Sequence, residues 1–75
     1  MTRYKNLSGK STVATYDLAK DSVTVGFATR AVYLYSNQSA GSRNVRQMKI
    51  LAEAGKGLGT FIDANVKTKF ARKIR

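Results

Sequence analysis

The stretch that decides the fold is VTVGFATRAVYLY, residues 23–35. In its first part, Val23, Val25 and Phe27 alternate with small or polar residues, which is the period of a strand with one apolar face. Its second part, residues 31–35, is apolar at every position, so the pattern leaves its buried face open. The short segment between the two parts can form a turn. We therefore predict an antiparallel hairpin at the centre of the protein.

The length of this turn decides which face of the sheet carries Tyr33 and Tyr35. A loop of two or four residues places Val25 opposite Leu34 and directs both tyrosines to the other face. A loop of three residues places Val25 opposite Tyr33, because a shift of one residue exchanges the faces of a strand. We predict the even loop, in a four-residue form built on a type I turn, because it joins the two most apolar sets of side chains.

The chain before the hairpin divides into three segments. Residues 1–11 are polar and basic without an apolar period, and we predict a basic flexible N-terminal arm. Residues 12–16 are β-branched, apolar or aromatic, which is typical of a short strand. Residues 17–21 supply a turn into the hairpin.

The chain after the hairpin has two helical patterns. Residues 36–42 form a polar loop, and a helix then runs from Ser39 or Ser42 to Gly55, a residue that can end it in the left-handed conformation. A second helix begins near Thr60, and its apolar residues recur at intervals of four: Ile62, Val66, Phe70 and Ile74. The predicted fold is α+β: a three-stranded antiparallel β-meander followed by two C-terminal α-helices packed on one face. Residues 12–75 form the single domain.

The charge of the chain is strongly positive and uneven. Fourteen Lys and Arg against four Asp and Glu give a net charge of +10 over 75 residues. Residues 43–75 hold nine of the bases and two of the acids. This distribution is typical of a protein that binds nucleic acid or another polyanion. The alternative is that the charge serves only to keep a small protein in solution.

The composition gives little material for catalysis. The chain has no His and no Cys, and only four carboxylates. We expect no enzymatic activity, no metal and no cofactor. No apolar run approaches the length of about 18 residues that a membrane span requires, so we expect no membrane partner and a cytoplasmic location.

The candidate nucleic-acid-binding residues fall into two kinds. Tyr33 and Tyr35 lie two residues apart on one face of a strand and can stack on unpaired bases if that face is open. The alternative is that both rings belong to the core. Lys and Arg side chains can neutralise phosphates without reading the sequence of the nucleic acid. The basic candidates are Arg30, Arg43, Arg46, Lys49, Lys56, Lys67, Lys69, Arg72, Lys73 and Arg75.

These patterns together resemble the KTSC domain, a small family named for its occurrence at the C-terminus of some lysyl-tRNA synthetases. The resemblance covers residues 11–70. It rests on Val25, Phe27, Tyr33, Leu34, Tyr35, Gly59, Phe61, Ile62, Val66, Lys67 and Phe70. Arg30 stands where the family places a turn glycine. The resemblance implies the fold given above, and it suggests RNA binding through the attachment of the family to tRNA synthetases.

Two functions fit these observations. The first is a small domain that binds RNA or single-stranded nucleic acid. The second is a protein-interaction module that binds an acidic surface or associates with itself through the edge of the sheet. The oligomeric state is not predicted by the sequence.

Overall fold

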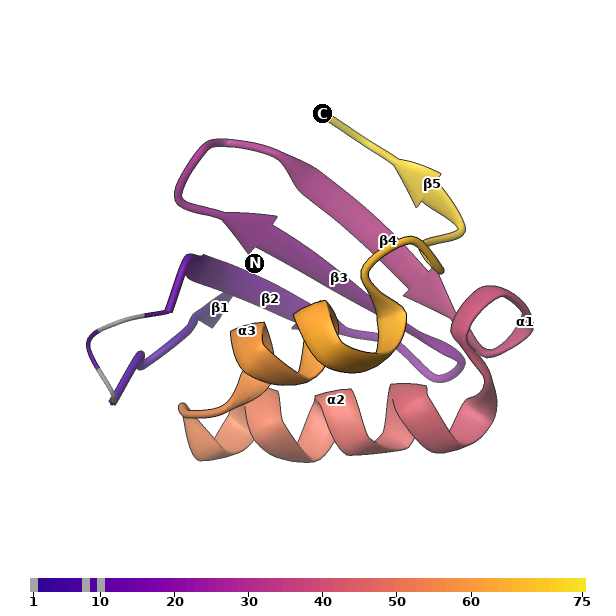
Figure 1. The fold of residues 1–75 in the computed structure, drawn as a ribbon, viewed down its shortest axis with the longest axis horizontal. Coiled ribbons are helices and arrows are strands. Elements are labelled where there is room, and N and C mark those ends of the chain that lie inside the picture. Colours follow the sequence, from indigo (N-terminus) through magenta and orange to yellow (C-terminus); the bar gives the residue numbers. More distant parts are fainter. Residues whose placement is uncertain (1, 8, 10) are drawn as a thin grey trace.

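The computed structural model describes all residues except Met1, Ser8 and Lys10. Its antiparallel sheet has the strand order β1-β2-β3-β4-β5. The strands are β1 (Thr2–Arg3), β2 (Val13–Leu18), β3 (Ser22–Phe27), β4 (Val32–Ser36) and β5 (Arg72–Lys73). The helices are α1 (Asn37–Ala40), α2 (Ser42–Ala54), α3 (Leu58–Phe61) and the π-helical turn η1 (Ile62–Val66). The predicted α+β class with an antiparallel sheet is confirmed, whereas the predicted number of three strands is wrong (Figure 1).

The central hairpin has the odd loop, so the predicted even loop is wrong. Val25 lies opposite Tyr33. The Phe27 amide donates to the Ala31 carbonyl at 2.8 Å, and the Arg30 amide donates to the Phe27 carbonyl at 2.9 Å. Arg30 has a φ of 73°, the left-handed conformation that closes a three-residue hairpin loop. This register places the rings of Tyr33 and Tyr35 on the core face, and these rings carry more apolar area than Val32 and Leu34 on the other face.

The N-terminal segment belongs to the sheet and the core. Thr2 and Arg3 pair with β2, and Tyr4 is buried with 3% of its surface exposed. The Leu58 amide at the start of α3 donates to the Tyr4 hydroxyl at 3.2 Å. Thr2, Arg3 and Tyr4 therefore do not form the separate arm predicted for residues 1–11. Three residues of that predicted arm, at positions 1, 8 and 10, lie outside the described residues.

The core lies between the inner face of the sheet and the helices. The fully buried residues include Val23 and Val25 from β3, Val45 and Met48 from α2, and Leu58 from α3. Figure 1 shows α2 and α3 on the same side of the sheet. Among the described residues, no helix combines the length and apolar character that a membrane crossing requires.

The second predicted helix ends early. Helical structure stops at Val66, and the chain turns back to pair β5 with β4. Phe70, which fits the helical period, packs its ring on Tyr33 with 4.7 Å between the centroids. The Ile74 amide donates to the Val32 carbonyl at 2.7 Å. The prediction of a helix through Ile74 is wrong because the open edge of β4 offers backbone partners that an isolated basic helix end lacks.

Candidate nucleic-acid interface

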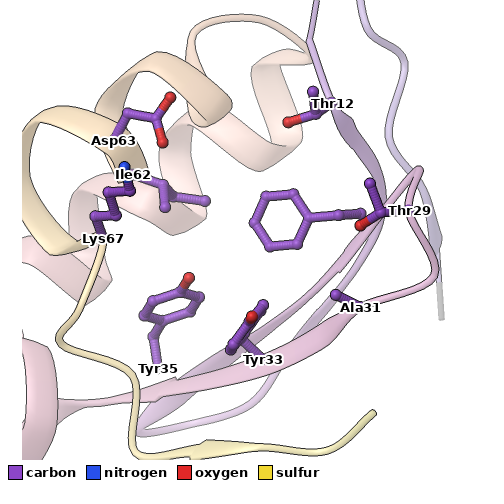
Figure 2. Close-up of a pocket in the computed structure, with 9 residues that line it drawn as sticks. Thr12, Thr29, Ala31, Tyr33, Tyr35, Ile62, Asp63 and Lys67 are labelled. Carbon is purple, nitrogen blue, oxygen red and sulfur yellow. The ribbon is translucent and has the colours of Figure 1, made fainter.

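A cavity of about 290 Å³ opens at the hairpin end of the inner sheet face. Figure 2 shows its two sides. The sheet side and the hairpin loop contribute Phe27, Thr29, Ala31, Tyr33 and Tyr35, and the segment before β2 contributes Thr12. The helical side contributes Ile62, Asp63 and Lys67. The cavity thus has apolar and aromatic walls, with charged side chains on one side of its mouth.

The aromatic rings that line this cavity pack against one another and against Phe70. Tyr33 meets Phe27 edge to face at 5.8 Å and 75°, and its ring lies 4.7 Å from that of Phe70. Tyr35 meets Phe70 at 6.5 Å and 90°. These separations lie in the range of favourable aromatic pairs, and such contacts restrict the rotation of the rings. The walls of the cavity are therefore formed before any ligand binds.

Of the two alternatives left open for Tyr33 and Tyr35, the structure has the core placement and not the open stacking platform. Tyr35 has 2% of its surface exposed, and Tyr33 is half-buried. Both rings lie on the face of Val23 and Val25, because the three-residue loop sets the register. The two tyrosines are therefore walls of a cavity.

The Tyr35 hydroxyl stays protonated. Burial, with smaller contributions from Tyr33 and the Asp63 carboxylate, raises the pKa of Tyr35 from 10.0 to about 12. Figure 2 shows this hydroxyl pointing into the cavity. At neutral pH, where a tyrosine of ordinary pKa is protonated as well, it is a neutral group that can donate or accept a hydrogen bond.

Basic side chains gather around the mouth of the cavity. Lys67 lines it directly, and the Lys73 ammonium lies 5.8 Å from the centroid of the Tyr33 ring. Arg30 is exposed between two lining residues of the hairpin loop. We call Arg30, Lys67 and Lys73 the cavity rim. The rim brings together residues that are 43 positions apart in the sequence, from Arg30 to Lys73.

A second group of basic side chains lies along α2, and we call it the α2 basic face. It consists of Arg43, Arg46, Lys49 and, from the turn after β2, Lys20. These side chains line two adjoining hollows of about 260 Å³ each, and Arg46 lines both. The Lys49 ammonium donates to the Lys20 carbonyl at 2.8 Å.

The remaining predicted bases lie outside these two groups. Arg72 pairs with Leu34, so it projects from the opposite face of β5 to Lys73. Arg75 continues the strand edge, where the Val32 amide donates to its carbonyl at 3.3 Å. Lys69 is exposed in the turn after η1, and Lys56 follows the C-terminal end of α2.

Sequence reasoning missed Asp63 and Thr12 as site residues. Asp63 precedes Lys67 by four residues, a spacing that places two side chains on one side of a helix, and this was the available signal. Thr12 carries no such signal, because only the tertiary fold brings it to the cavity. Within the part of the chain that the structure describes, no cluster of potential metal ligands is found.

Comparison with known proteins gives no further assignment. No protein-family model matches the chain, and neither the curated proteins nor the solved structures give a match. The resemblance to the KTSC domain therefore stays a prediction.

Proposed function

We propose that this protein is a small basic domain that binds RNA or single-stranded nucleic acid and has no catalytic role. The observation that carries the proposal is the cavity rim, where Lys67 and Lys73 stand beside the half-buried ring of Tyr33. Lys and Arg side chains interleaved with aromatic rings are typical of proteins that bind single-stranded nucleic acid. The basic side chains attract the phosphates, and the aromatic rings contact the nucleobases.

The shape of the site favours a single strand over a duplex. The aromatic surface lies inside a cavity, and a nucleobase reaches it only when it is unstacked and unpaired. In this proposal α2 and η1 cover the inner face of the sheet and leave the cavity open at its hairpin end. A regular duplex keeps its bases stacked and would contact the rim through phosphates alone.

The α2 basic face lies beside the turn between β2 and β3, at the end of the sheet away from the hairpin loop, and in this proposal it is a second, separate contact. Its side chains Arg43, Arg46 and Lys49 can neutralise further phosphates. They do so whatever the nucleotide sequence, because Coulomb attraction requires charge alone. Four to six neutralised phosphates would give a slope of log affinity against log salt of roughly −3 to −4 on a single strand, at about 0.7 per phosphate.

A salt titration tests the proposal. Binding of an oligouridine of about twelve nucleotides, of a duplex of equal length and of polyglutamate is measured at several salt concentrations. We expect the oligouridine to bind most tightly and with the slope given above. A flat salt response, or no binding of either nucleic acid, would overturn the proposal.

Tightest binding of polyglutamate would favour an acidic protein as the partner, which is the alternative function. Self-association through the sheet edge has less support. The two edge strands, β1 and β5, have two residues each, and β5 consists of Arg72 and Lys73. Short and charged edge strands discourage pairing with another sheet.

A further inference from the structure

The cavity has the size of a site for one small planar group. Its volume of about 290 Å³ lies at the lower limit of small-molecule sites, which range from roughly 300 to 1,000 Å³. A chain lipid or an oligosaccharide needs a longer site. A single heterocyclic ring system fits these dimensions and matches the aromatic walls of Phe27 and Tyr33.

The polar groups of the cavity are of different kinds. Asp63 offers carboxylate oxygens that only accept hydrogen bonds, whereas Lys67 offers a cation that only donates them. Both come from the helical side, and Figure 2 shows both at the mouth, across from Thr12. The Tyr35 hydroxyl points into the space between the two sides. A matching ligand carries neighbouring donors on one part of its edge and an acceptor on another.

Guanine is the nucleobase that best meets this requirement. Its Watson–Crick edge presents two adjacent donors, the ring N1–H and the exocyclic amino group, beside the O6 acceptor. Adenine and cytosine present one exocyclic amino group each beside a ring acceptor. Uracil has a single N–H between two carbonyl oxygens. A carboxylate that accepts from this N–H is repelled by both oxygens.

We propose that the cavity captures one unstacked guanine of a single-stranded nucleic acid, with the Asp63 carboxylate on its two donors and the Tyr35 hydroxyl or the Lys67 ammonium on O6. This inference rests on the proposed function and adds a base preference to it. The phosphates that flank the captured base meet Lys73 and Arg30 on the rim. The Tyr35 hydroxyl is protonated at neutral pH and can donate a hydrogen bond to O6.

The test compares two oligonucleotides that differ in one base. Binding of an oligouridine of about twelve nucleotides is measured with and without a single central guanine. We expect the guanine to tighten binding about tenfold, since a two-pronged hydrogen-bonded contact to a base discriminates by roughly 5- to 150-fold. Equal affinity for the two would overturn the guanine pocket and leave the proposed function intact. Absence of binding to both would overturn the proposed function as well.

Variants assign the preference to the cavity. Asp63→Asn should abolish the tenfold preference while binding plain oligouridine at least as well, because it removes one negative charge near the strand. Glu53→Gln is the matched control, since Glu53 is an exposed acid on α2 that does not line the cavity and its substitution removes the same charge. It should keep the preference. Equal preference in the two variants would overturn the assignment to Asp63.

The source of the base is tested with a mononucleotide. Guanosine monophosphate should compete with the guanine-containing strand at least tenfold less well than the unlabelled strand does, because it carries a single phosphate where the strand offers several to the rim and to the α2 basic face. Equal competition would overturn the single strand as the source of the guanine.

Discussion

Tyr33 lies directly opposite Val25 in the ladder between β3 and β4. This pairing places the tyrosine on the core face of the sheet, and Tyr35 lies opposite Val23 on the same face. The aromatic residues that the sequence presents as a possible platform are therefore the walls of a cavity. The cavity that they line lies at the hairpin end of the sheet and includes Lys67.

Replacement of Tyr35 tests its place in the core. Tyr35→Ala should lower the free energy of unfolding by about 3–5 kcal/mol, the loss expected when a large buried aromatic side chain is removed. Tyr35→Phe keeps the ring and should stay within about 1 kcal/mol of the wild type. Denaturant unfolding measures both. A Tyr35→Ala variant as stable as the wild type would contradict the observed register.

The conformation of Arg30 leads to a gain in stability. A residue other than glycine at a φ of 73° carries a steric cost of about 1–2 kcal/mol. Arg30→Gly removes this cost, but glycine also loses more chain entropy on folding. We expect a net gain of about 0.5–1 kcal/mol in thermal or denaturant unfolding.

Arg30→Ala is the control for this gain, because it removes the same charge and keeps the steric cost. It should not stabilise the protein. Equal stabilisation by both substitutions would assign the effect to charge and would contradict the conformational explanation.

The raised pKa of Tyr35 predicts a loss of stability at alkaline pH. The unfolded chain releases this proton near pH 10.0, whereas the folded protein holds it to about pH 12. The contribution to stability is therefore complete below pH 10 and is lost as the pH rises through that interval. Because the hydroxyl faces a cavity open to solvent, we expect a loss of at most about 2 kcal/mol.

Urea unfolding of the wild type and of Tyr35→Phe at about pH 9 and about pH 11.5 measures this loss. The wild type should lose more stability than the variant between the two values. An equal loss in both would show that Tyr35 is not the group responsible.

Tyr4 joins the N-terminal segment to α3, and its replacement tests that connection. Tyr4→Phe removes the hydrogen bond from the Leu58 amide and should cost about 1 kcal/mol. Tyr4→Ala also removes the buried ring and should cost about 3–5 kcal/mol. Unchanged unfolding of both variants would indicate that residues 2–4 are separate from the domain.

Local patterns in the sequence predicted part of this structure correctly. The alternation of Val23 and Val25 located β3, and the stripe of Val45 and Met48 located α2, whose end at Gly55 has the predicted left-handed conformation. These features depend on residues close together in the chain. The excess of bases after residue 42 was also readable from composition alone.

The features that were missed depend on contacts across the fold. Residues 31–35 are apolar on both faces, so only the loop geometry at Arg30 could decide the register. Phe70 and Ile74 fit a helical period, but residues between them form β5, which pairs with the edge of β4. The strand β1 has two polar residues and no pattern to detect. The cavity results from all of these choices, and for that reason it was not predicted.

The central claim is that the cavity rim binds a single strand, and a charge-reversal comparison tests it most directly. Lys67→Glu with Lys73→Glu removes two bases from the rim, where both side chains are exposed. Lys5→Glu with Lys56→Glu changes the net charge equally at a part of the chain outside the rim and outside the α2 basic face. Affinity for the guanine-containing oligouridine is measured for both variants and for the wild type at one salt concentration. The account predicts a loss of at least tenfold for the rim variant and a clearly smaller loss for the control. Equal losses in the two variants, or no loss in the rim variant, would contradict it.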